Sequence, residues 1–155
     1  MDVIIRDAMP DDIETIMEFN RRMALETESR VLDPSVARRG VAELFARPEL
    51  GRYFVACGNP GQASRGNAIS AAEKDGAMEA GIVGQCMITY EWSDWRAGLF
   101  WWIQSVYVQP DFRGRGVFRA VFQHVRSLAR ASAEVCGLRL YVEHNNTGAI
   151  STYRR

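Results

Sequence analysis

The segment that carries the most chemical information is residues 105–122, SVYVQPDFRGRGVFRAVF. An apolar, strand-like stretch is followed by a loop with Gly114 and Gly116, and the loop leads directly into a helical pattern. Glycine lacks a Cβ, so the backbone can approach a ligand closely. The first turn of a helix presents N–H groups and the positive end of the helix dipole. Because Arg113 and Arg115 add positive charge, the segment predicts a site for a phosphate-bearing ligand.

The loop sequence RGRGVF does not match two common phosphate-binding motifs. A P-loop requires Gly-Lys-Ser/Thr after its second glycine, and a dinucleotide-binding fingerprint requires three glycines. Coenzyme A is the phosphate ligand that remains. Taken by itself, the loop leaves open a plain strand-to-helix turn that uses glycine only for its geometry.

The elements around this loop are predicted from the spacing of apolar residues and from breaking residues. The first helix is expected to start at Asp11, because Asp11 and Glu14 have the spacing of a capping box. Asp33 and Pro34 mark the start of the second helix. Residues 58–80, rich in Gly, Ala and Ser, are expected to form a long surface loop. Strands are expected at 2–6, 52–57, 81–92, 98–108 and 138–142, and helices at 11–27, 33–48, 115–133 and from Asn146 onward.

The strand–helix–strand unit over residues 99–142 implies a parallel strand pair with a right-handed crossover. The earlier strands are expected to pair antiparallel. The predicted fold class is therefore α/β (α+β), with a mixed central sheet and helices on both faces. No repeat or linker divides the chain, so residues 1–155 are expected to form a single domain.

Composition narrows the classes of function. Lys plus Arg and Asp plus Glu both number 19, and this zero net charge argues against a broad nucleic-acid-binding face. No run approaches the roughly 20 apolar residues that span a bilayer. The three cysteines, Cys57, Cys86 and Cys136, form no CxxC pair, so we expect buried reduced thiols and no metal site. These features are typical of a soluble, cytoplasmic protein.

Two motifs together resemble the GNAT superfamily of N-acetyltransferases. Arg113 and Gly116 match motif A of that family, Q/R-x-x-G-x-G/A, whereas Phe118 stands where the family usually has Gly or Ala. The order of elements over the whole chain also fits. A second motif, N-x-x-A-x-x-x-Y, is matched by Asn146, Ala149 and Tyr153.

The resemblance implies an enzyme that transfers an acetyl group from acetyl-CoA to a primary amine by direct attack. It implies that residues 106–108 splay from the strand at 138–142, and that pantetheine pairs with the exposed backbone there. It also implies a set of cofactor-binding residues: Val106, Tyr107, Val108, Arg113, Gly114, Arg115, Gly116, Val117, Phe118 and Asn146.

The resemblance further implies that Tyr153 is the general acid that protonates the departing thiolate, with a packed aromatic residue as the alternative. Glu91 ends a long strand and is our candidate base, although a solvated carboxylate on a hairpin is an equal reading. The tryptophans of this hairpin either pack in the core or line the acceptor pocket: Trp92, Trp95, Trp101 and Trp102.

Two readings of the function stay open: an active N-acetyltransferase, and an acyl-CoA-binding module without turnover. The acceptor is expected to be an amine of a small molecule or peptide, whose identity the sequence does not define. GNAT domains usually continue beyond the tyrosine with two more strands, which this chain is expected to lack. A partner copy in a homodimer would be one source of cover for that edge.

Overall fold

The computed structural model describes residues 2–58 and 81–141. The order of strands and helices there agrees with the predicted order. Of the predicted loop at 58–80, Gly58 ends β2 and the rest lies outside the described residues, as does the predicted helix from Asn146. The elements are β1 (Val3–Asp7), η1 (Pro10–Asp12), α1 (Ile13–Glu28), α2 (Pro34–Ala46), β2 (Gly51–Gly58), β3 (Gly81–Ser93), β4 (Gly98–Val108), η3 (Pro110–Phe112), α3 (Val117–Ala131) and β5 (Val135–Leu140).

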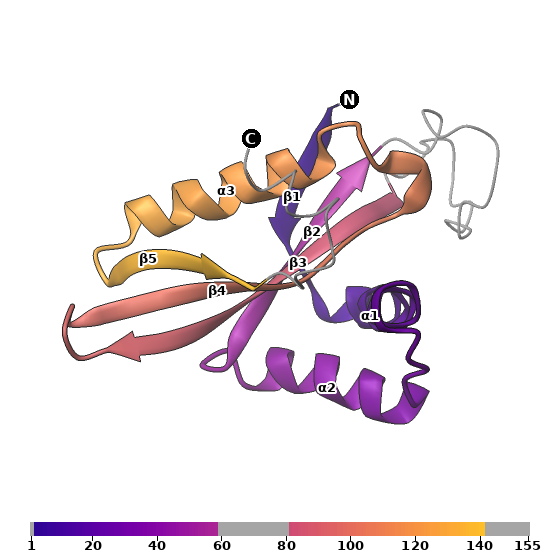
Figure 1. Ribbon diagram of the computed structural model, residues 1–155, viewed down its shortest axis with the longest axis horizontal. Helices are drawn as coiled ribbons and strands as arrows, with labels where there is room; N and C mark the ends of the chain where they lie inside the picture. Colours follow the sequence, from indigo (N-terminus) through magenta and orange to yellow (C-terminus); the bar gives the residue numbers. More distant parts are fainter. Residues whose placement is uncertain (1, 59–80, 142–155) are drawn as a thin grey trace.

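The strands form one sheet in the order β1-β2-β3-β4-β5. Neighbours from β1 to β4 run antiparallel, whereas β4 and β5 run parallel because α3 connects them. In Figure 1, α3 lies along one face of the sheet, and α1 and α2 lie on the opposite face. The predicted mixed sheet with helices on both faces is therefore confirmed.

The main core lies between α3 and the sheet. Val117, Val121 and Val125 recur every fourth residue and are buried, so they form the apolar stripe expected of an amphipathic helix. They pack on a sheet face that includes Cys86 and Ile103. This core fixes the start of α3 against the strands, and with it the glycine loop that precedes the helix.

A second core lies between the sheet and the helices α1 and α2. Ile16, Val41, Tyr53 and Val55 are buried in it. As predicted, α2 begins at Pro34, where the Asp33 side chain accepts hydrogen bonds from backbone N–H groups in the first turn.

The predicted capping box at the start of the first helix is wrong. The short helix η1 precedes α1, and it is Asp12 whose carboxylate accepts a hydrogen bond from the Met9 N–H at 2.7 Å. Asp12 also accepts two hydrogen bonds from the Arg6 guanidinium, at 2.7 and 3.0 Å. Glu14 instead pairs with Arg38 of α2.

Two other boundaries differ from the prediction. The helix expected from residue 115 begins at Val117, because Gly114 and Gly116 have positive φ angles that an α-helix does not accept. The last described strand lies at Val135–Leu140 rather than 138–142, and it begins to pair at Leu99 of β4.

The cysteines in the described residues are free thiols, with Cys57 and Cys86 buried and Cys136 partly buried. Burial raises the pKa of the Cys86 thiol to about 12. Of the helices in residues 2–58 and 81–141, none has the length and apolar character needed to cross a membrane. The same residues hold no cluster of His, Cys, Asp and Glu that could bind a metal ion.

Candidate functional site

The glycine loop between β4 and α3 has the backbone geometry that its sequence predicts. Gly114 and Gly116 have φ angles of +73° and +85°, in the left-handed region that favours glycine. Gly116 is the residue that caps α3. A Cβ added at either glycine would meet no atom of the described residues within 4 Å, so among these residues the requirement for glycine is conformational.

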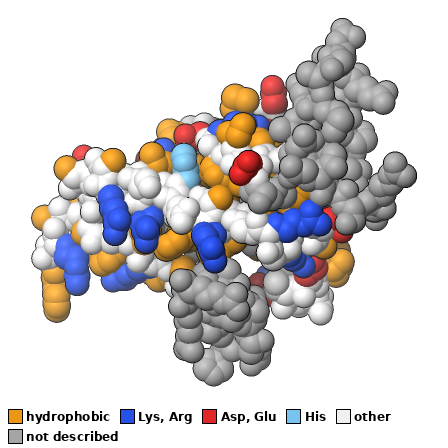
Figure 2. All heavy atoms as spheres, turned by 90° about the horizontal axis from the view of Figure 1, so that it is seen from above, with side chains coloured by type: hydrophobic (Ala, Val, Ile, Leu, Met, Phe, Trp, Pro, Cys, Tyr) orange, Lys and Arg blue, Asp and Glu red, His pale blue; other side chains and the backbone are white. Residues whose placement is uncertain are grey.

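The start of α3 adds a positive potential at this loop. An α-helix leaves the N–H groups of its first turn without intrahelical acceptors, and these groups favour an anion. Arg119, Arg126 and Arg130 are exposed along α3, and no acidic residue lies between Asp111 and Glu134. Figure 2 shows basic side chains spread over this face of the molecule.

Arg113 connects three parts of the fold. Its Nε donates to the Val108 carbonyl at 2.8 Å, and its Nη2 donates to the Glu26 carboxylate at 2.5 Å. The guanidinium also lies 5.4 Å from the centre of the Tyr107 ring. The side chain that we predicted to bind the cofactor therefore holds the end of β4 and the loop against α1.

The other residues of this segment that were predicted to bind the cofactor differ in how exposed their side chains are. Arg115 is exposed at the loop. The side chain of Val117 is buried in the core, which leaves only its backbone for a ligand. Phe118 is partly buried, with its ring 6.1 Å from that of Phe122 one turn along α3. The large side chain at this unusual motif position thus runs along the helix.

The described pairing of β4 with β5 covers only the first half of β4. Their pairing stops at Ile103 and Leu140, while β4 continues to Val108. The Gln109 N–H donates to the Val83 carbonyl of β3 at 2.9 Å. Backbone groups of successive strand residues point to opposite edges, so those of Val106 and Val108 point away from β3. In the described residues β5 gives them no partner, and Arg113 takes the Val108 carbonyl.

A β-bulge marks the point where this open edge begins. The register between β3 and β4 shifts by one residue between Gln85 and Met87, and Ser105 has a φ of +47°. Positive φ is uncommon for a residue other than glycine and is frequent at functional sites. Bulges also redirect the backbone groups of the strand that contains them.

Tyr107 lies on the open half of β4 but directs its side chain beneath the sheet. The hydroxyl donates to the Glu26 carboxylate at 3.0 Å, and the ring lies 5.0 Å from that of Phe19. Burial, together with the hydrogen bond to Glu26, raises the pKa of Tyr107. Its side chain therefore ties β4 to α1 instead of facing the open edge.

Glu91 does not lie at the open edge. It is opposite Phe100, and Phe100 is about 10 Å along the strand from the last paired residue, Ile103. One carboxylate oxygen accepts a hydrogen bond from the Trp102 indole, and the other pairs with Arg139 of β5 at 3.1 Å. The sequence analysis missed this ion pair, and the role of Glu91 as base stays a prediction.

The hairpin tryptophans do not form one cluster. Trp101 is buried and lies 6.2 Å from the Tyr90 ring, in agreement with core packing. Trp92 and Trp95 are 63% and 90% exposed in the part of the chain that the structure describes. Of the predicted site residues, Asn146 and Tyr153 lie outside the described residues.

Sequence analysis also missed a set of polar residues below the bulge: Asn20, Tyr53, Gln85 and Ser105. One signal was available, because Gln85 interrupts the apolar run of β3. Its partner on α1 could not be inferred from local pattern.

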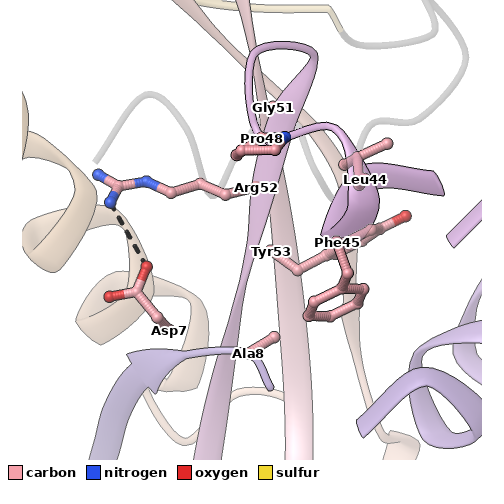
Figure 3. A pocket seen from close by; sticks show the side chains of 8 residues that line it. All are labelled: Asp7, Ala8, Leu44, Phe45, Pro48, Gly51, Arg52 and Tyr53. Carbon is pink, nitrogen blue, oxygen red and sulfur yellow. Dashed lines mark hydrogen bonds and ion pairs between the residues drawn. The ribbon is translucent and has the colours of Figure 1, made fainter. Parts of the chain in front are cut away.

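A small cavity of about 140 Å³ lies elsewhere, between α2 and the start of β2 (Figure 3). Asp7 and Arg52 form an ion pair at 3.4 Å beside it, and Leu44, Phe45 and Pro48 supply apolar lining. None of its lining residues belongs to the glycine loop or the open strand edge, so we do not assign it to the same site.

The geometry defines a class of protein: a mixed sheet whose parallel strand pair is followed by a glycine loop and a helix N-terminus. Such a site suits an extended ligand that carries both amides and phosphates. The sequence model of the Acetyltransferase (GNAT) family matches residues 43–155, and the chain belongs to this family. The family uses acetyl-CoA.

Solved structures agree. A possible acetyltransferase from Clostridium difficile 630 is 37% identical, with a TM-score of 0.79 over 98% of this chain and 87% of that chain. A predicted acetyltransferase from Clostridium acetobutylicum, whose crystal structure was determined with acetyl-CoA, is 14% identical, with a TM-score of 0.66 over 98% of this chain and 88% of that chain. This second similarity concerns the fold alone. No curated protein sequence matches the chain.

Proposed function

We propose that this protein binds acetyl-CoA and transfers its acetyl group to a primary amine. The observation that supports the proposal is the glycine loop at Gly114 and Gly116, which follows the part of β4 at Val106 and Val108 that has no partner among the described residues of β5. One stretch of chain thus offers backbone partners for pantetheine and a phosphate site.

Binding would use the backbone more than the side chains. The amides of pantetheine would pair with the carbonyl of Val106 and with the N–H of Val108, which have no partner among the described residues of β5, and so satisfy polar groups that are costly to bury unpaired. The pyrophosphate would lie against the first turn of α3, with Arg115 as a nearby positive charge.

The chemistry needs a neutral amine next to the thioester. A lysine-like amine has a pKa of about 10.4, so roughly 1 in 10³ molecules is neutral at pH 7. The amine nitrogen forms a bond to the carbonyl carbon as the C–S bond breaks. The nitrogen loses a proton to a base or to water, with Glu91 as the candidate base, and the thiolate takes up a proton, with Tyr153 as the candidate acid. Holding the two reactants together supplies part of the rate enhancement.

The acceptor belongs to the broad class of primary amines, in a small molecule or a peptide. Neither the Glu91–Arg139 ion pair nor the exposed Trp92 and Trp95 selects among them. The alternative function, binding of acyl-CoA without turnover, differs only in the absence of transfer, and therefore needs an assay of its own.

The first experiment tests the cofactor. A ligand that binds only the folded state stabilises it by about 2.7 kcal/mol at a hundredfold excess over its dissociation constant. We expect acetyl-CoA and CoA to raise the thermal midpoint clearly, and ATP to raise it much less. Equal shifts with ATP and CoA would contradict a coenzyme A site.

The second experiment tests turnover. We expect thiol release from acetyl-CoA to rise when one member of a panel of amines is added, with the acetylated amine confirmed by mass spectrometry. A clear thermal shift with no acetylated product from any amine class would favour the binding module.

A further inference from the structure

A buried polar network crosses the layer between α1 and the sheet. Gln85 of β3 is only 1% exposed, and its Nε2 donates to Asn20 Oδ1 of α1 at 2.7 Å. Asn20 in turn donates through Nδ2 to the Tyr53 hydroxyl of β2 at 3.1 Å. The hydroxyl of Tyr53 also forms a hydrogen bond with the Ser105 side chain. Two strands and a helix thus converge on the bulge of β4.

Gln85 also reaches the backbone of the bulge. Its Nε2 lies 3.4 Å from the carbonyl oxygen of Ser105. In a planar trans peptide the carbonyl and the following N–H point in opposite directions. Because the Ser105 carbonyl points toward Gln85, the Val106 N–H points away from it. This agrees with the strand alternation, which places the Val106 backbone on the open edge.

One atom of the network lacks a hydrogen bond. The Oε1 atom of Gln85 is buried and has no hydrogen-bond partner among the described residues. A buried polar atom without a partner is destabilising. Unsatisfied buried groups of this kind call for an explanation, and a functional one fits a residue beside the site.

We propose that Gln85 is a positioning residue for the transfer reaction. By holding the Ser105 carbonyl, it directs the Val106 N–H toward the place where the thioester carbonyl oxygen of acetyl-CoA lies. That N–H then donates to the oxygen as negative charge develops on it, which is how a fixed donor lowers the barrier of an acyl transfer. Asn20 and Tyr53 hold Gln85 in this orientation. The inference rests on the proposed function.

The test reads the polarisation of the thioester directly and needs no acceptor. A carbonyl that accepts a hydrogen bond absorbs infrared light at lower frequency than a free one. With carbonyl-labelled acetyl-CoA, we expect the bound carbonyl of the unmodified protein to absorb at lower frequency than in solution. In Gln85→Met we expect bound acetyl-CoA of similar affinity whose carbonyl frequency returns toward the solution value.

Kinetics and the carbonyl frequency separate positioning from structure. With an amine that is accepted, Gln85→Met should lower kcat by on the order of 10- to 10²-fold, as small misplacements of a reacting group do. Its thermal midpoint should fall modestly, because the Asn20 Oδ1 and the Ser105 carbonyl lose the donor that Gln85 supplies. A residue with only a structural role would also lower the midpoint but would leave the carbonyl frequency unchanged.

Gln123→Met is the matched control, because it makes the same chemical change at an exposed position on α3, far from the bulge. If Gln85→Met does not fold, Asn20→Leu tests the network from α1, with a smaller frequency change in the same direction. An unchanged carbonyl frequency in the folded variant overturns the inference. Failure of the unmodified protein to bind acetyl-CoA overturns the proposed function instead.

Discussion

Arg113 and Glu26 form an ion pair at 2.5 Å that joins the glycine loop to the last turn of α1. The residues are 87 positions apart, and the same guanidinium holds the Val108 carbonyl at the end of β4. Arg113, which matches the family's phosphate-binding motif, therefore also connects the loop to α1 across the sheet. The geometry indicates that the shape of its guanidinium matters as well as its charge.

Arg113→Lys separates those two roles. Lysine keeps the positive charge but is a point donor that does not reproduce two hydrogen bonds in different directions. We expect Arg113→Lys to weaken CoA binding by about tenfold, nearly as much as Arg113→Ala, because either change releases the loop. Isothermal titration calorimetry with CoA measures this. Affinity retained by the lysine variant and lost by the alanine variant would assign the side chain to charge alone.

Tyr153 tests the proposed proton donor. Tyr153→Phe removes only the hydroxyl, so turnover should fall by on the order of 10²–10⁴, the usual contribution of a general acid. Acetyl-CoA affinity should hardly change, since the hydroxyl acts in the transition state rather than in the ground state. Steady-state kinetics and calorimetry on the same sample measure both. Turnover at the unmodified rate would assign proton donation to water or to the amine.

Much of this fold followed from local pattern. The stripe of Val117, Val121 and Val125 predicted the buried face of α3, and the pair Asp33-Pro34 predicted where α2 begins. The crossover from β4 through α3 to β5 followed from handedness and spacing. In each case the signal lies within one element or its cap.

The parts that escaped prediction depend on contacts between distant residues or on single backbone angles. Gln85 and Asn20 are 65 positions apart, so their hydrogen bond has no local signal. Ser105 adopts a positive φ without being glycine, which a search for glycine turns cannot find. The start of α1 was displaced because a short helix places Asp12, rather than Asp11, at the cap.

The Asp12–Arg6 pair makes stability depend on pH. Burial opposes ionisation of Asp12, but hydrogen bonds from Arg6 and from the Met9 N–H outweigh it, so the pKa of Asp12 lies below its usual value. A lowered folded-state pKa stabilises the protein above the unfolded pKa of about 3.9, and this contribution is lost as pH falls through the folded value. Stability should therefore decline as the pH falls below about 4.

Asp12→Asn measures the size of this contribution. The variant should lose about 2 kcal/mol of unfolding free energy at neutral pH, because a hydrogen-bonded charge pair is broken, and its curve should be flatter than that of the unmodified protein in acid. Urea denaturation from neutral to acid pH provides the comparison. Asp11→Asn, at the exposed neighbouring position, is the matched control and should change neither value. Parallel acid curves for Asp12→Asn and the unmodified protein would contradict the assignment.

The last prediction compares Gly116 and Gly40, because replacing each by alanine should change the unfolding free energy in opposite directions. Gly116→Ala places a Cβ at a φ of +85°, which costs about 1 kcal/mol in unfolding free energy. Gly40, exposed within α2, has no positive φ and no atom within 4 Å of an added Cβ. Gly40→Ala should therefore stabilise the protein by about 0.5–1 kcal/mol, since alanine is the better helix residue.

Binding distinguishes the two glycines more sharply than stability. Because no described residue would contact a Cβ at Gly116, we attribute any loss of CoA affinity beyond the strain to the ligand meeting the new methyl group. We expect Gly116→Ala to weaken CoA binding by about tenfold or more, and Gly40→Ala to leave it unchanged. Thermal denaturation of the two variants measures their stability, and calorimetry measures their CoA affinity. Normal CoA affinity in a folded Gly116→Ala protein would place the phosphates away from the start of α3.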